Sequence, residues 1–167
     1  NHHAALAVFG GRLYAMWSSG RRNEDDCGQR VMLSSSEDFV HWSAPQPLVD
    51  SQQGQRSELV LTAGGFYCRE GILRAYFGRY EYPFSCLREE GRLRPEAKDD
   101  PGHLGTCMGV LSTMDGEHWT APRLLEVPVV PNHGPQLTRS GRLIVSGGVM
   151  YPYSDDPSGE GRFTITG

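Results

Sequence analysis

The sequence lacks the features that mark several broad classes of protein. No apolar run approaches the roughly 20 residues of a membrane-spanning helix. Basic residues are not in excess, since 16 Lys and Arg stand against 20 Asp and Glu and give a net charge of −4. That balance provides no electrostatic footprint for nucleic acid or for an anionic membrane surface. We therefore expect neither of these partners and no membrane span.

Metal-type spacings are absent as well. The four cysteines form no C-x-x-C pair and the histidines show no ligand spacing, so we expect no metal and no cofactor. Isolated cysteines in a chain of this size are more often reduced than bridged. Cys68 and Cys107 lie in or beside predicted strands, however, so one disulfide stays an alternative. The cysteines whose redox state is open are Cys27, Cys68, Cys86 and Cys107.

No window shows a sustained helical period of apolar residues. The hydrophobic residues, 38% of the chain, come in short pieces that end at Gly, Pro, Asp or Ser, and 21 Gly with 11 Pro require frequent turns. This pattern predicts an all-β chain. We expect strands at residues 6–9, 13–18, 30–34, 47–49, 58–62, 73–78, 107–112, 123–127, 136–138, 143–147 and 162–166.

Two short patterns repeat along the chain. The first, S-x-x-D-x-x-H-W-[ST]-A-P, starts at Ser35 and again at Ser112, and its two tryptophans lie 77 residues apart. The second is a Gly-x-Leu step at Gly11, Gly71 and Gly141, where glycine permits the positive φ of a tight hairpin turn. Repetition at this scale predicts a modular fold in which each unit is one small sheet.

The repeats divide one domain, residues 1–167, into units at about 4–50, 56–128 and 133–167. The second unit is longer because it holds a polar insert at 87–103, which we expect to be a long loop with room for one helical turn. The third unit ends before its own copy of the first pattern, and the chain opens without an initiator Met or a signal-like segment. We therefore expect an incomplete array, with its compartment open between cytoplasmic and secreted, that is inactive and partly unfolded or aggregated by itself.

The first pattern resembles the Asp box, or BNR repeat, of sialidase-like β-propellers, whose usual form is S-x-D-x-G-x-x-W. The two copies read S-x-D-F-V-H-W from Ser36 and T-x-D-G-E-H-W from Thr113, with one residue fewer between Asp and Trp. They also resemble the turns of five-bladed glycosidase propellers, and the His-Gly-Pro-Gln-Leu segment at His133 resembles the opening of a sialidase-like blade. The resemblance implies a β-propeller of four-stranded antiparallel blades, with about two and a half blades present.

The repeated residues are expected to be structural. An Asp in this position accepts hydrogen bonds from turn N–H groups, and the Trp packs between layers. Asp38 and Asp115 could instead form a catalytic carboxylate pair, but an active site is needed once and these residues occur in each unit. The predicted structural set is Ser35, Asp38, Trp42, Ser112, Asp115 and Trp119.

Propeller topology places the candidate site opposite those turns. Strands alternate in direction, so the loops from second to third strands and the connections between units share the other face. We expect catalytic residues at Asp26, Glu58, Glu81 and His133, and substrate-binding residues at His3, Arg56, Arg79, Tyr82, Asn132 and Tyr151. The alternatives are a solvated loop for Asp26, a surface salt bridge between Arg56 and Glu58, coverage of a strand end for Tyr82, and a turn-stabilising role for His133.

The resemblance implies a carbohydrate-active enzyme with a carbohydrate substrate as its partner. We expect a glycoside hydrolase that cleaves terminal sugars in an exo-sialidase-like way, with Asp26 or Glu81 as acid/base, Glu58 as polar partner and Arg56 as anion ligand. Sialidase chemistry would imply a Tyr nucleophile activated by Glu, and the Arg-Ile-Pro element of sialidases is absent from the sequence. The alternatives are a polysaccharide lyase and a non-catalytic glycan-binding propeller.

Overall fold

A computed structural model describes residues 2–87, 102–148 and 150–165 of the chain. Within these ranges the fold is all-β, as predicted, apart from one 3-10 turn, η1 (Phe84–Cys86). Most of the insert predicted at 87–103 lies outside the described residues. Among the helices that the structure describes, none has the length and hydropathy that a membrane crossing requires.

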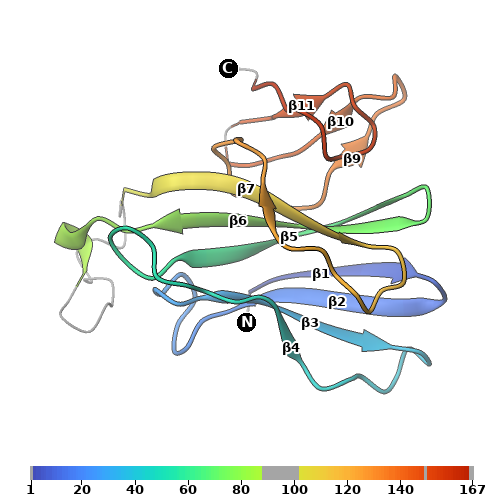
Figure 1. Cartoon of the computed structure of the whole chain (residues 1–167), viewed down its shortest axis with the longest axis horizontal. Helices are drawn as coiled ribbons and strands as arrows, with labels where there is room; N and C mark the ends of the chain where they lie inside the picture. The colour runs from blue at the N-terminus through green and yellow to red at the C-terminus, as the bar shows by residue number, and fades with distance from the viewer. Residues whose placement is uncertain (1, 88–101, 149, 166–167) are drawn as a thin grey trace.

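The first sheet is a four-stranded antiparallel meander whose spatial order equals its sequence order (Figure 1). Its hairpin turn between the first two strands is tight, and Gly11 adopts the predicted positive φ of 80°. The last strand lies at the outer edge, as expected for a propeller blade. The strands are β1 (His2–Phe9), β2 (Arg12–Ser19), β3 (Arg30–Ser36) and β4 (Gln46–Val49).

The second sheet repeats this topology, again in sequence order. Gly71 closes its first hairpin with a φ of 72°, which confirms the role expected for the repeated glycines. Its outer strand is shorter than the predicted segment 123–127. The strands are β5 (Val60–Arg69), β6 (Ile72–Glu81), β7 (Leu104–Thr113) and β8 (Arg123–Leu124).

The third unit differs from the prediction in its last strand. Its sheet consists of β9 (Gln136–Leu137), β10 (Leu143–Ile144) and β11 (Tyr153–Ser154). We expected the third strand at 162–166 and a loop around Tyr153. The chain instead turns back earlier, because the Val145 N–H donates to Pro152 O at 2.9 Å and fixes this segment beside β10. The later segment meets Tyr153 only through a single bridge at Thr164.

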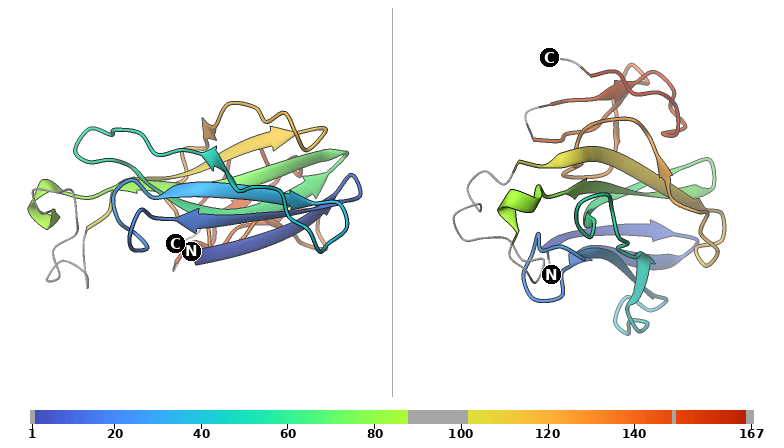
Figure 2. Two further views of the ribbon diagram at one scale, coloured as in Figure 1. Left: turned by 90° about the horizontal axis from the view of Figure 1, so that it is seen from below. Right: turned by 60° about the vertical axis from the view of Figure 1, so that its left-hand side comes forward.

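The three sheets pack in order, with the second between the other two (Figure 2). Alternation along β6 explains this arrangement, since neighbouring side chains point to opposite faces of a strand. Phe77 belongs to a core cluster shared with Met16 and Val31 of the first sheet. Its neighbour Tyr76 belongs to a second cluster with Val145 and Phe163 of the third unit. One strand thus supplies both inter-sheet cores, and the innermost strands β1 and β5 lie side by side.

Candidate functional site

The two repeated turns have the same hydrogen bonds. Asp38 Oδ1 accepts from the N–H groups of Val40 at 2.9 Å and His41 at 2.7 Å. In the second copy Asp115 Oδ1 accepts from the corresponding N–H groups of Glu117 and His118, both at 2.8 Å. Each carboxylate also meets the ring Nδ1 of the same histidine, at 2.6 and 2.7 Å. Both carboxylates therefore bind backbone N–H groups within their own turns.

These contacts also hold the two carboxylates in their ionised form. For Asp38 the His41 side chain is the largest cause of a strongly lowered pKa, and for Asp115 the His118 N–H is the largest. The hydroxyls that bond to the carboxylates belong to Ser36 and Thr113, one residue after the predicted Ser35 and Ser112. The backbone of Ser35 instead bonds to Ser43: its carbonyl accepts from the Ser43 N–H, and its N–H donates to the Ser43 hydroxyl. Ser112 and Thr120 make the same two bonds, so each pair ties the two sides of its turn together.

The two tryptophans of these turns differ in their surroundings. Trp119 packs against the core cluster between the first and second sheets, as predicted. Trp42 was predicted to be a core anchor too, but it is 43% exposed. Trp42 belongs to no core cluster of the described residues, and none of them forms a sheet on the first sheet's side away from the second (Figure 2).

A cavity of about 410 Å³ lies at the opposite end of the molecule from these turns. The loop between β2 and β3 and the connection that precedes β9 both contribute to its wall, together with the innermost strands β1 and β5. Two predicted binding residues, His3 and Asn132, line it. The other polar groups at its wall are Asp25, Thr62, Tyr80, His103 and Thr106.

Tyr80 lies at the centre of this wall. Its hydroxyl donates to Asp25 Oδ1 at 3.2 Å and lies 3.5 Å from the Tyr82 hydroxyl. The ring of His103 stacks on Tyr80, with 3.9 Å between centroids. Burial is the main cause that raises the pKa of Tyr80 far above its ordinary value, and Tyr82 and Asp25 add to it. Tyr80 therefore stays protonated and acts as a hydrogen-bond donor.

The loop that carries Asp25 is anchored to the second sheet. Buried Gln29 accepts from the Asp25 N–H at 2.8 Å and donates to Leu61 O at 3.0 Å. Gly28 N also donates to Leu59 O at 3.2 Å. These bonds hold Asp25 at a positive φ of 61°, a conformation that Asp and Asn tolerate better than most residues. These contacts therefore fix the loop, and with it the position of the Asp25 carboxylate.

Glu81 lies on the other face of β6 and is only 5% exposed. Its Oε2 accepts from the N–H groups of Arg56 at 2.6 Å and Ser57 at 3.2 Å. Burial alone would raise the pKa of Glu81, but backbone N–H donation from residues 55–57 outweighs it and the pKa is lowered. Gly54 lies directly against the carboxylate, since a Cβ there would be 2.4 Å from Glu81 Cδ. The carboxylate therefore organises the connection between the first two sheets.

The remaining predicted charged residues form separate contacts. Glu58 accepts a bidentate pair of hydrogen bonds from Arg21 at 2.7 and 2.8 Å. The salt bridge that we considered between Glu58 and Arg56 is therefore replaced by one to Arg21. The Arg56 side chain is exposed. Arg79 lines a different cavity, on the face of β6 opposite Tyr80, and its Nε atom is buried without a partner among the described residues.

Four further predicted residues are absent from the lining of the cavity. His133 is held in place by Gly134 O at 2.7 Å and by the Ser146 hydroxyl at 2.9 Å, which fits the alternative of a turn-stabilising histidine. Tyr151 is 56% exposed, beside Met150, which does line the cavity. Asp26 follows Asp25 but does not line the cavity, and its charge helps to raise the pKa of the Cys27 thiol, which burial raises most. Tyr82 is fully buried beneath Tyr80.

Sequence reasoning missed Asp25, Tyr80 and His103 as cavity residues. The signal for Tyr80 was present, because period-two alternation in a strand separates Tyr80 from Arg79 and Glu81. No pattern distinguished Asp25 from Asp26, since the positive φ at Asp25 decides which carboxylate faces the cavity. His103 sits at the end of the long insert, where the sequence carries no periodicity. Among the described residues, no cluster of three or more His, Cys, Asp or Glu could hold a metal ion.

Comparison with known proteins is informative only at the level of structure. No family model matches the chain, and no curated protein sequence matches it. Trypanosoma rangeli sialidase in complex with sialic acid superposes with a TM-score of 0.61 at 10% identity, over 99% of this chain and 30% of that chain. Penicillium chrysogenum α-L-arabinanase complexed with arabinobiose gives 0.59 at 15%, over 97% and 44%. A Bacillus subtilis arabinanase gives 0.54 at 12%, over 99% and 55%.

These identities show a shared fold and nothing finer. The chain spans 30–55% of the length of these three neighbours. All three are similar to it over nearly its entire length, so the likeness covers each of the three sheets and their order.

Proposed function

We propose that this chain, a sialidase-like β-propeller by its fold, belongs to a carbohydrate-active enzyme, a glycoside hydrolase acting on terminal sugars. One observation carries the proposal. The end of the molecule opposite the repeated turns holds a cavity where Asp25, Tyr80, His103 and Asn132 converge. A carboxylate, a phenol, an amide and a stacked ring are the groups that bind a polyhydroxylated ring. We also assign the two repeated turns to the Asp-box family as part of this proposal.

Within this site we assign the acid/base role to Asp25 in place of Asp26. Its carboxylate lines the cavity and accepts from Tyr80, which stays protonated. A carboxylate that is positioned beside substrate can donate or accept the proton of a glycosidic oxygen. Glu81 and Glu58 then act through the loops that they hold, and Arg56 remains our candidate for an anionic substituent. His3, Asn132 and Tyr151 complete the proposed binding region, with Tyr82, His133 and Arg79 as supporting residues behind it.

One observation favours a second candidate, a propeller that binds glycan without catalysis. Hydrolysis with two carboxylates requires a second acid near the first. Glu58 and Glu81 are both engaged, by Arg21 and by backbone N–H groups. Asp25 is therefore the one carboxylate that lines the cavity within the part of the chain that the structure describes.

The intact protein tests both candidates when it is assayed with an aryl sialoside, neutral aryl glycosides including an arabinofuranoside, and a uronate polysaccharide. Asp25→Asn keeps the positive φ and should lower kcat/KM about 100-fold or more on the cleaved substrate. Asp50→Asn, an exposed carboxylate outside the cavity, is the matched control and should leave the rate unchanged.

Full activity of Asp25→Asn would contradict the assignment. Saturable binding of one of these sugars without turnover would favour the binding propeller. New ultraviolet absorbance from the uronate polysaccharide would identify a lyase.

A further inference from the structure

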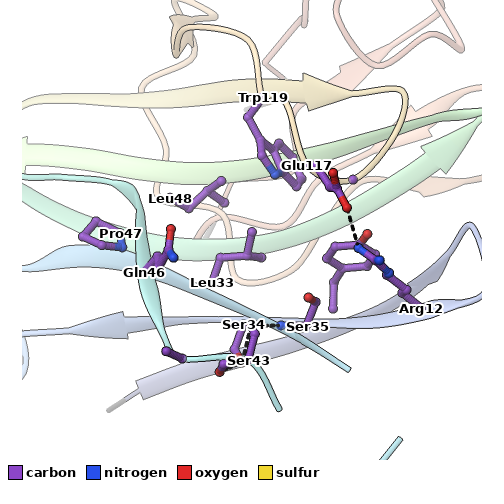
Figure 3. A pocket seen from close by; sticks show the side chains of 13 residues that line it. Arg12, Leu33, Ser34, Ser35, Ser43, Gln46, Pro47, Leu48, Glu117 and Trp119 are labelled. Carbon is purple, nitrogen blue, oxygen red and sulfur yellow. Dashed lines mark hydrogen bonds and ion pairs between the residues drawn. The ribbon is translucent and has the colours of Figure 1, made fainter. Parts of the chain in front are cut away.

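A second cavity, of about 420 Å³, lies at the other end of the molecule, among the repeated turns. Its walls come from β2, β3 and β4 of the first sheet and from the hairpin that joins β7 to β8 in the second (Figure 3). The indole of Trp119 points from that hairpin toward Leu33 and Leu48 on the opposite wall (Figure 3). The fold therefore leaves a hollow between two neighbouring blades, far from the candidate active site.

The polar groups of this hollow carry little free charge. Arg12 stands at its rim and is neutralised by Glu117 at 2.9 Å and by Glu37. Gln46 is exposed at the wall, and Tyr14 lines it with a side chain that is only 2% exposed. Trp119 Nε1 is buried without a hydrogen-bond partner among the described residues. Serine hydroxyls of β3 and the turn complete the polar wall.

The same gap occurs a second time and shows what fills it when it is closed. Between the second sheet and the third unit, residues at the equivalent positions, 77 further along the chain, line a cavity of only about 220 Å³. Arg123 takes the place of Gln46, and its guanidinium donates to Glu160 O at 2.9 Å and approaches Glu160 Oε2 at 3.3 Å. An ion pair thus plugs the second gap. In the first gap a neutral amide stands at that place and the space stays open.

We propose that the open hollow between the first two blades binds a neutral saccharide unit, as a carbohydrate site distinct from the candidate active site. Trp119 offers an apolar ring face for the C–H side of a sugar, and Gln46 and Tyr14 offer donors and acceptors for its hydroxyls. An anionic sugar is disfavoured, because the one cation at the rim is already paired twice. The volume is within the range of small-molecule sites.

A single sugar ring has few atoms, so its affinity is low, with a Kd of about 1–10 mM. This inference does not require turnover at the candidate active site. A chain that binds sugar here and lacks hydrolase activity would support this site while the proposed function failed.

The test is a nitrogen–proton correlation spectrum of the intact, isotope-labelled protein during titration with D-galactose, L-arabinose, D-glucose and N-acetylneuraminic acid. The sequence has three tryptophans, whose indole signals are assigned from single Trp→Phe variants. We expect a saturable shift of the Trp119 indole signal with at least one neutral sugar, and none at Trp42. Gln46→Ala should weaken that binding about 3- to 10-fold.

A variant that copies the closed gap provides the sharpest control. Gln46→Arg places the residue of the plugged gap at the open one and should abolish the saturable shift while the melting temperature stays the same. Trp42→Phe changes the matching position of the first turn, outside the hollow, and should leave the Kd unchanged. Absence of a Trp119 shift at 50 mM sugar, an unchanged Kd in Gln46→Ala, or shifts confined to Tyr80 and His103 would each overturn the proposal.

Discussion

At the scale of single residues, β6 shows how one strand gives adjacent side chains opposite tasks. Tyr80 faces the cavity and is kept protonated by burial. Glu81 faces the connection between the sheets and is kept ionised by backbone N–H groups. The two residues are neighbours in sequence, yet the pleat separates them completely. A role assigned to one cannot be transferred to the other.

Glu81 should make folding stability depend on acid pH. Its pKa in the folded state lies below the ordinary 4.5, so its stabilising effect is present above that value and is lost as pH falls through the folded pKa. Glu81→Gln should lower the free energy of unfolding by about 1–3 kcal/mol at pH 7, and by less near pH 3. Urea denaturation between pH 3 and 7 measures this. The exposed Glu70→Gln serves as control, and a Glu81→Gln deficit that is equal at every pH would contradict the argument.

Residue roles were the least predictable part of the site. The sequence identified His3 and Asn132 as cavity residues because topology alone brings their segments to one end. It placed the acid at Asp26 where the structure presents Asp25, because Gln29 holds the Asp25 backbone and is itself bound to Leu61, 32 residues away in the sequence. Alternation along β6 explains two further errors: Arg79, predicted at the site, lies on the opposite face of the strand, and Tyr80, which was not predicted, faces the cavity.

At the scale of elements, the two repeated turns allow the same tryptophan to be compared in two different environments. Trp119→Ala removes a ring that packs between two sheets and should lower the free energy of unfolding by about 2–4 kcal/mol. Trp42→Ala removes a ring that is 43% exposed and should cost about 1 kcal/mol or less. Chemical denaturation of both variants gives the comparison. Equal losses would show that the turn itself, rather than inter-sheet packing, determines the contribution of the ring.

Strands were largely predictable because hydrophobic pieces and turn glycines are local signals. Every predicted strand of the first two sheets has its counterpart, from β1 to β8. The third unit was harder, since β11 contains Tyr153 and Ser154 in a polar segment that reads as a loop. Its pairing depends on hydrogen bonds to β10 and on the bridge to Thr164, and local composition does not encode either contact.

At the scale of the whole molecule, one buried cation ties the third unit to the second sheet. The Arg74 side chain is 6% exposed and meets Glu160 at 2.8 Å. The Tyr76 hydroxyl, next to it on β6, donates to Gly159 O at 2.7 Å. Both contacts join residues of β6 to the segment that follows β11. The third unit, whose strands are short, therefore depends on side chains of its neighbour.

Glu160→Ala should consequently destabilise the third unit. It leaves the Arg74 guanidinium buried without its charge partner, at a cost of about 3–5 kcal/mol. The Arg142–Asp155 pair offers a matched control, because its side chains are 44% and 72% exposed and Asp155→Ala should cost less than about 1 kcal/mol. Hydrogen exchange read by mass spectrometry should show faster exchange in residues 136–165 of the Glu160 variant. Protection equal to that of Asp155→Ala would contradict this view.

The molecule-wide arrangement was predictable in outline, since repeats of known spacing require stacked sheets. The different filling of the two inter-blade gaps was not predictable. It depends on whether a charged partner lies opposite the residue at the equivalent position, as Glu160 does for Arg123 in the second gap, whereas Gln46 lines the open first gap. The repeat spacing shows which positions of the two units are equivalent. It does not show which of these residues has a charged side chain opposite it.

The order of strands within the sheets has a consequence for biosynthesis. In each sheet of the described residues, strands that are consecutive in the sequence are neighbours. At roughly 5–20 residues per second, a ribosome releases such a sheet within several seconds, and each hairpin can form as soon as it emerges. The first sheet then provides an apolar surface on which the second assembles, so translation itself supplies a template and the described strands pair without waiting for a distant partner.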